Sequence, residues 1–247
     1  MLPGQQPHDS SMQRSLLCAF LWAASLAAAA PAYAWMSPSV RNPNNGHYYA
    51  FFTGFNGDTS GSWSQRPPMP FADALTRAAS MSHLGVPGHL ATITSQAEQD
   101  FVHQYFFELR RTRRLGAGEL AWIAASDSAV EGEWRWVAGP EVGQQFWQGN
   151  FDGVALGFQN WRLINGKLYE PSDSGPRVGE DFVALNFSLS FSQSESWWND
   201  VSTRDDSMSF VPRMGLVEFS PVPEPSSVVL LGGAFVAFFA ARRCRFR

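Results

Sequence analysis

Cysteine is nearly absent from this chain. Its two cysteines, Cys18 and Cys244, lie near the two ends, and none occurs between residues 35 and 222. A domain in that stretch can form no disulfide, so a hydrophobic core or a bound metal must hold it together. A core is available, because every tryptophan except Trp22 lies in the same stretch.

Lysine is scarcer still, since Lys167 is the single one in the chain. The whole chain has 18 basic and 22 acidic residues; leaving out residues 1–34 and 223–247, the counts are 13 and 20, a net charge of −7. This acidic balance argues against nucleic acid as a partner, and it is compatible with divalent cations.

The first 34 residues have the pattern of a secretory signal peptide. Arg14 precedes an apolar run over 16–30, and the exit reads Pro-Ala-Tyr-Ala. This order predicts an exported protein that is cleaved after Ala34. The polar start also leaves Met12 open as the initiator.

The other end, residues 222–247, is predicted to be a sorting tail. Pro223-Glu224-Pro225 is followed by 16 mostly apolar residues, 226–241, and then by four arginines. As a helix the apolar segment would be roughly 24 Å long, slightly short for a bilayer core of about 30 Å. The arginines would stay cytoplasmic.

The tail resembles the bacterial PEP-CTERM sorting signal. That resemblance implies transient anchoring in the inner membrane, processing by an exosortase, and release to the cell surface or extracellular matrix in bacteria that make exopolysaccharide. A tail that simply stays in the membrane is the alternative.

The remaining residues, 35–221, are predicted to form one α+β domain. Small and apolar residues recur at helical spacing over 72–82, and a short strand is expected over 88–93. A second helix is expected to begin at Ser95, with Glu98 closing a capping box. The later part of the chain breaks into short strand-like segments at 121–126, 133–138, 180–187 and 215–219.

The order of several motifs resembles the C-type lectin-like domain, over residues 46–220. The residues that carry the resemblance are Gly88-His89-Leu90-Ala91, Glu98, Trp122-Ile123-Ala124, Gly132-Glu133-Trp134-Arg135-Trp136, Asn160-Trp161, Glu170-Pro171-Ser172, Glu180-Asp181-Phe182, Trp198-Asn199-Asp200 and Val217-Glu218-Phe219. Phe182 and Val217 stand where the family usually has disulfide cysteines, which suggests that packing replaces the bridge. The tryptophans Trp122, Trp134, Trp136 and Trp198 are expected to be structural.

The resemblance also implies a Ca²⁺ site that holds a sugar through two adjacent hydroxyls. Calcium takes six to eight oxygen ligands. Carried over by position, the metal ligands are Glu170, Ser172, Glu180, Asn199 and Asp200. Ser172 replaces the family's asparagine, and Asp173 is the neighbour that can compensate. Pro171 is the counterpart of a proline that is cis in sugar-binding members.

Other chemistry-bearing residues carry weaker patterns. Glu131 and Glu133 could form a carboxylate pair for glycoside hydrolysis, although a polar turn is the simpler interpretation. His89 is expected to be structural, and His83 and His103 have no partner at metal-ligand spacing.

The chain is therefore predicted not to be an enzyme. The leading hypothesis is an exported calcium-dependent module that binds carbohydrate or exopolysaccharide. The alternative is a calcium-independent lectin-like domain for protein adhesion or matrix assembly.

Overall fold

The computed structural model describes residues 35–54, 68–112, 120–172, 179–187, 196–202 and 211–221, which all belong to one unit, residues 31–247. The predicted signal peptide and tail, with Cys18 and Cys244, lie outside these ranges. Neither helix of the described part is long and apolar enough to span a bilayer.

The predicted α+β class is confirmed. The described ranges contain helices α1 (Phe71–Ser80) and α2 (Gln96–Arg111) and the strands β1 (Val40–Arg41), β2 (Tyr48–Thr53), β3 (Ser82–His83), β4 (Val86–Pro87), β5 (His89–Leu90), β6 (Leu120–Ser126), β7 (Glu133–Trp136), β8 (Gln145–Gln148), β9 (Val154–Ala155), β10 (Leu163–Ile164), β11 (Lys167–Leu168), β12 (Phe182–Phe187), β13 (Ser196–Val201) and β14 (Met214–Phe219).

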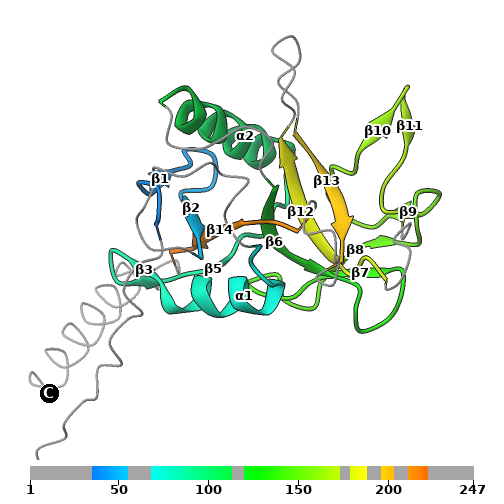
Figure 1. Ribbon diagram of the computed structural model, residues 1–247, viewed down its shortest axis with the longest axis horizontal. Helices are drawn as coiled ribbons and strands as arrows, with labels where there is room; N and C mark the ends of the chain where they lie inside the picture. The colour runs from blue at the N-terminus through cyan, green and yellow to red at the C-terminus, as the bar shows by residue number, and fades with distance from the viewer. Residues whose placement is uncertain are drawn as a thin grey trace, which may run out of the picture. The chain divides into compact units, whose positions relative to one another are not determined.

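Ten of these strands form one branched sheet. Its main path runs β1-β2-β14-β6-β7-β8-β9. The sheet branches at β6, which also pairs with β12 and through it with β13, and at β14, which also pairs with β5. The neighbours are antiparallel except β14 and β6, which run parallel. Figure 1 shows β7 to β11 gathered at one end, beside β13. That end carries the candidate site.

Helix α1 packs through one aromatic and two small side chains. Phe71, Ala74 and Ala78, spaced three and four residues apart, are its buried face, as an amphipathic helix requires. The chain returns closely past this face: a Cβ on Gly88 would lie 2.7 Å from the carbonyl oxygen of Ala78. Glycine at residue 88 therefore lets β5 approach α1. The predicted helix over 72–82 is found one residue earlier and ends two residues sooner.

Helix α2 begins as predicted but with a different reciprocal bond. The Ser95 side chain accepts a hydrogen bond from the Glu98 N–H. Glu98 reaches back to the N–H of Thr94 (2.8 Å) rather than to that of Ser95, and its other oxygen accepts a hydrogen bond from the Tyr49 hydroxyl. Its carboxylate is thus drawn into the core and ties α2 to β2.

Apolar packing is found at Phe182 and Val217, the two positions where the C-type lectin-like family usually has disulfide cysteines. Phe182 stacks on Phe71 of α1, with ring centroids 4.3 Å apart, and meets Trp122 edge-on. Val217 is fully buried in β14. Stacked aromatic rings thus connect α1 to the sheet beside the candidate site.

Candidate functional site

A buried tryptophan holds the strand that carries two of the predicted site residues. Trp198 is fully buried, and its indole N–H donates to Gln99 Oε1 of α2 at 2.9 Å. Four aromatic rings meet its ring edge-on, those of Trp136, Phe146, Phe158 and Trp161. Asn199 and Asp200 follow directly, paired with Ala184 and Val183 of β12. The two site residues therefore sit on a rigid strand.

Backbone hydrogen bonds bring the Glu170 segment to the same strand. The Trp198 N–H donates to the Asn160 carbonyl (2.7 Å), and the Arg162 N–H donates to the Trp198 carbonyl (3.1 Å). The Glu170–Pro171 peptide bond is cis, as expected from the resemblance. Ser172 N–H then donates to Asp200 Oδ2 at 2.7 Å. Glu170 and Asp200, thirty residues apart in sequence, thereby become neighbours.

Both carboxyl groups are buried, Glu170 being 4% and Asp200 1% exposed. Asp200 lies beneath the surface because β13 keeps it on the same face as Trp198. Loss of hydration raises the pKa of Glu170 above its ordinary value, and the charges of Asp200 and Glu180 raise it further. Glu170 Oε2 is buried with no hydrogen-bond partner among the described residues. Two buried carboxyl groups side by side favour neutralisation by a proton or by a cation.

The other predicted ligands lie around this pair in different states. Asn199 is half-buried, and its side-chain N–H donates to the Asp200 carbonyl at 2.9 Å. Ser172 and Glu180 are half-buried, and Asp173 lies outside the described residues. Over the described ranges, no group of three or more His, Cys, Asp or Glu side chains has the geometry to hold a metal ion.

The donor types nonetheless fit a hard divalent cation. Glu170 and Asp200 offer carboxylate oxygens, and Asn199 offers an amide oxygen, the ligand classes that calcium takes. Glu170 Oε2 has no competing hydrogen-bond donor in the described part of the chain.

A second acidic group, not predicted from the sequence, surrounds Asp127. This residue is buried; its Oδ2 accepts a hydrogen bond from the Gly132 N–H (2.9 Å), and its Oδ1 has no partner in the described part of the chain. Burial raises the pKa of Asp127 to about 7, with added repulsion from Glu131 and Asp181. The spacing of Asp127 and Glu131 across a turn could have indicated this acidic group from the sequence. Asp181 is distant in the sequence and lies near Asp127 only in the folded structure.

The carboxylate pair considered for glycoside hydrolysis is divided in the structure. Glu133 forms an ion pair with Arg135 at 2.9 Å, whereas Glu131 is exposed in the turn and acts on Asp127. His89 is structural as predicted, since its ring nitrogens contact the Leu90 carbonyl (2.8 Å) and the Ser220 hydroxyl (3.0 Å).

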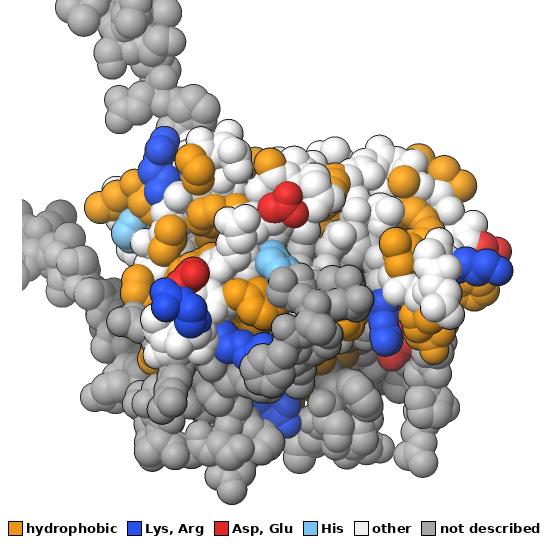
Figure 2. Space-filling model, turned by 90° about the horizontal axis from the view of Figure 1, so that it is seen from above, with side chains coloured by type: hydrophobic (Ala, Val, Ile, Leu, Met, Phe, Trp, Pro, Cys, Tyr) orange, Lys and Arg blue, Asp and Glu red, His pale blue; other side chains and the backbone are white. Residues whose placement is uncertain are grey.

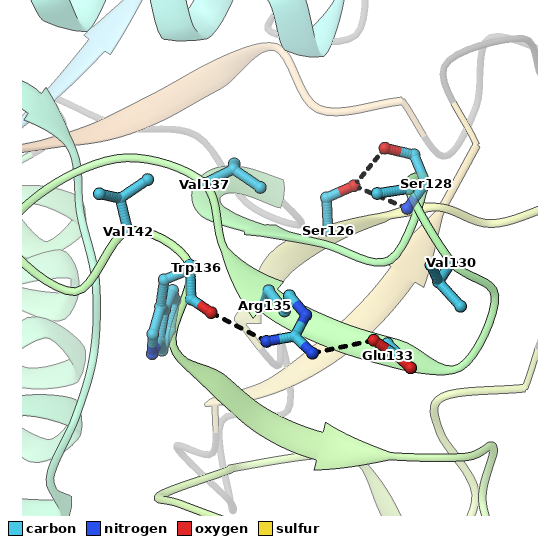
Figure 3. Close-up of a pocket in the computed structure, with 10 residues that line it drawn as sticks. Ser126, Ser128, Val130, Glu133, Arg135, Trp136, Val137 and Val142 are labelled. Atoms are coloured by element: carbon cyan, nitrogen blue, oxygen red, sulfur yellow. Dashed lines mark hydrogen bonds and ion pairs between the residues drawn. The ribbon is translucent and has the colours of Figure 1, made fainter.

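A separate open pocket of about 280 Å³ lies on the outer side of β7. Figure 3 shows Val130, Val137 and Val142 around it, with Arg135 reaching toward Glu133. Arg135 also donates to the Gly143 carbonyl at 2.9 Å. None of the predicted calcium or sugar ligands lines this pocket, although Trp136, predicted to be structural, does.

Comparison with known proteins identifies the tail and finds relatives for the domain. Residues 221–243 match the PEP-CTERM protein-sorting motif, as predicted, and this motif indicates export. Halomucin from Haloquadratum walsbyi is 30% identical over 190 residues, which are 77% of this chain and 2% of halomucin. The chain thus spans only a small fraction of that curated relative.

Among solved structures, C-type lectin domains are similar to this chain. The C-type lectin CEL-I from Cucumaria echinata is 21% identical, with a TM-score of 0.41, covering 70% of this chain and 89% of CEL-I. The carbohydrate-recognition domain of the human scavenger receptor C-type lectin is 20% identical, with a TM-score of 0.40, covering 70% and 92%. Human lithostathine is 16% identical, with a TM-score of 0.39, covering 70% and 84%.

Proposed function

We propose that this chain is an exported carbohydrate-binding domain whose sugar site is assembled on a calcium ion beside Glu170 and Asp200. The observation that carries the proposal is the buried pair of carboxyl groups. Burying two negative charges together costs free energy unless a cation or a proton neutralises them. The fold keeps Glu170 next to Asp200, whose strand is anchored by Trp198. This arrangement is unfavourable without a cation, and a bound cation would make it stabilising.

In this proposal the described residues divide into ligands and supports. Glu170, Asp200 and Asn199 would hold the ion, which when bound supplies a coordination point for two adjacent sugar hydroxyls. Glu180 adds negative charge, as its effect on Glu170 indicates. Ser172 contributes its backbone N–H to Asp200, and its side-chain hydrogen bond to Glu170 opposes the rise of that group's pKa. Asp173 remains the proposed compensating ligand.

Calcium dependence is tested by thermal unfolding of the purified protein in calcium and in chelator. A ligand that binds only the folded state stabilises it by about 2.7 kcal/mol at a hundredfold excess over Kd. We expect the melting temperature to rise with calcium and to return with chelator. Magnesium is the matched control, because it demands a tighter octahedral shell. An unchanged melting temperature across millimolar calcium would contradict the calcium site.

Sugar binding is tested on a glycan array with and without calcium. A single shallow site is expected to bind near millimolar, roughly −4 kcal/mol. Retention on a polysaccharide would then arise from many copies on one surface, where linked sites increase avidity.

A calcium-independent adhesion domain is the second candidate, and Ser172 is the observation that favours it. A serine hydroxyl is shorter than an asparagine amide, so it cannot both coordinate an ion and donate to a sugar in the same way. Ser172→Asn separates the two candidates. Stronger calcium-dependent sugar binding by the variant supports the lectin function, whereas no effect, together with an empty array for the wild type, supports protein adhesion.

A further inference from the structure

A short hairpin projects next to the candidate site. It consists of β10 and β11, begins at Arg162 and ends at Tyr169, directly before Glu170. Its turn residues Asn165 and Gly166 have φ values of 52° and 75°, as a two-residue type I′ turn requires. The Tyr169 N–H donates to the Arg162 carbonyl at 2.9 Å, and the Arg162 N–H donates to Trp198. The hairpin is thus fixed at its base to β13.

The Arg162 guanidinium rests on two aromatic rings at this base. Its Cζ lies 5.4 Å from the ring centroid of Tyr169 and 5.3 Å from that of Trp197, within the range of about 6 Å for a cation–π contact. Over the described residues, no salt bridge and no side-chain hydrogen bond occupies this guanidinium. Its ring contacts fix its position, while its planar fork of N–H donors stays available for an acceptor.

The Arg162 guanidinium contacts the face of β13 that also carries Asn199, one of the proposed calcium ligands. Trp197 and Asn199 are two residues apart on β13, so their side chains share a face, about 7 Å apart along the strand. That separation is comparable to the span of one pyranose unit. Tyr169, on the other side, is 50% exposed and adjoins Glu170.

The hairpin also differs in charge from the acidic domain around it. Residues 162–169 contain two cations, Arg162 and Lys167, and no acidic residue. At the end of the molecule where Figure 1 places β9 to β11, Figure 2 shows hydrophobic and basic side chains together, with acidic side chains beside the basic ones. An anionic ligand approaching this acidic surface is therefore favoured at the hairpin.

We infer that Arg162 binds the carboxylate of an acidic sugar, in the unit next to the one held at the Glu170–Asp200 site. The ligand class is then a uronate-containing polysaccharide. The inference rests on the proposed function. A guanidinium fork pairs with a carboxylate through two parallel hydrogen bonds, and the exposed Tyr169 ring offers an apolar face to the C–H side of a pyranose. An acidic peptide has the carboxylate but no such ring.

The test measures binding of three probes to the full chain by calorimetry, in calcium and then in chelator. The probes are trigalacturonate, its neutral methyl ester and triglutamate. Arg162→Gln removes the charge, Arg162→Lys keeps it without the fork, and Lys167→Gln is the matched control on the same hairpin. Melting temperatures of all variants report whether the hairpin base is intact.

We expect trigalacturonate to bind more tightly than its methyl ester. Arg162→Gln should weaken trigalacturonate binding about tenfold or more, since hydrogen bonds to charged groups are strong, and leave the ester unaffected. The affinity of Arg162→Lys for trigalacturonate should lie between those of wild type and Arg162→Gln. Lys167→Gln should change this affinity less than twofold.

Contrary results separate the inference from the proposed function. Equal, calcium-dependent binding of acid and ester overturns the acidic subsite and leaves the proposed function standing. Equal weakening of both probes by Arg162→Gln, with a lower melting temperature, shows a purely structural arginine. Triglutamate that competes as well as trigalacturonate overturns the sugar assignment. Arg162-dependent binding of trigalacturonate that persists in chelator supports the subsite and contradicts calcium dependence. No binding of any probe overturns the acidic subsite and leaves the proposed function to the glycan array.

Discussion

At the scale of single residues, the candidate site depends on two acidic groups that would be unfavourable anywhere else in the core. Asp200 accepts the Ser172 N–H, and Glu170 lies beside it, both almost fully buried. Their repulsion is a cost in the metal-free protein, and the same repulsion would make a cation stabilising. Whether a substitution at residue 200 stabilises or destabilises the protein should therefore depend on calcium.

Asp200→Asn is expected to remove the calcium-induced rise in melting temperature and calcium-dependent sugar binding. In chelator the variant should melt no lower than wild type, because the amide oxygen still accepts the Ser172 N–H while the repulsion of Glu170 is relieved. Asp152→Asn, an exposed position on the loop after β8, is the control. A variant that keeps the full calcium response would show that Asp200 is not a ligand.

Glu98 predicts a pH dependence that is independent of the candidate site. Burial raises the pKa of Glu98 to about 7, and the negative charge of Glu218 adds to this effect. A carboxyl group whose pKa is raised in the folded state stabilises the protein fully below its unfolded value, near 4.5, and this stability is lost as pH rises through about 7. A shift of this size corresponds to roughly 3 kcal/mol.

We therefore expect the free energy of unfolding to fall between about pH 4.5 and 7, and Glu98→Gln to make that fall less steep. Part of the fall should remain, because the pKa values of Asp127 and Glu170 are also raised. The measurement is denaturant unfolding across pH in chelator. His47 acts in the same direction, because its hydrogen bond with Glu218 raises its pKa. Glu108→Gln, exposed on the same helix, should leave the pH profile as in wild type.

At the scale of elements, β13 couples the core to the site through alternate residues. Trp198→Ala is expected to destabilise the whole domain by about 3–5 kcal/mol, as truncations of large buried aromatics do. Trp198→Phe retains ring contacts but leaves Gln99 Oε1 without its donor, for a loss of about 1–3 kcal/mol. Urea unfolding of both variants checks the order; equal losses would contradict the contribution of the Gln99 bond.

Elements could be predicted where the interactions that form them lie between residues close together in the sequence. The cap at Ser95 and the apolar spacing of α1 are local, and both helices were found within a few residues of their observed bounds. The hairpin at 163–168 carries a recognisable Asn-Gly turn, yet it was not predicted. The bond from Glu98 to Tyr49 was unpredictable, because it joins residues 49 positions apart.

The candidate site shows the same limit. The motif order brought forward Glu170, Asn199 and Asp200, and residue type indicated oxygen chemistry. Their burial could not be predicted, since it follows from the register of β13 on β12 and from the hydrogen bonds between residues 160–162 and Trp198. Asp127 and the Arg162 stack were missed because one partner of each, Asp181 and Trp197 respectively, comes from a separate segment.

At the scale of the whole molecule, the distribution of cysteine leads to a prediction about the exported form. Both cysteines lie in segments predicted or matched as targeting signals, so protein recovered from the cell surface should contain neither. Intact mass checks this, and its melting temperature should be the same with and without a reducing agent. A mass that includes the arginines after residue 241 would favour a tail that stays in the membrane.

The tryptophans around residue 198 give the domain a built-in optical reporter. The ring centroid of Trp198 lies 5.8 Å from that of Trp136 and 5.9 Å from that of Trp161, and both pairs of rings are steeply inclined to each other. Indoles so close exchange excitation energy and produce a strong near-ultraviolet circular dichroism signal when held rigidly. Because Asn199 and Asp200 continue the strand of Trp198, occupancy of the site should be visible in this signal without any attached dye.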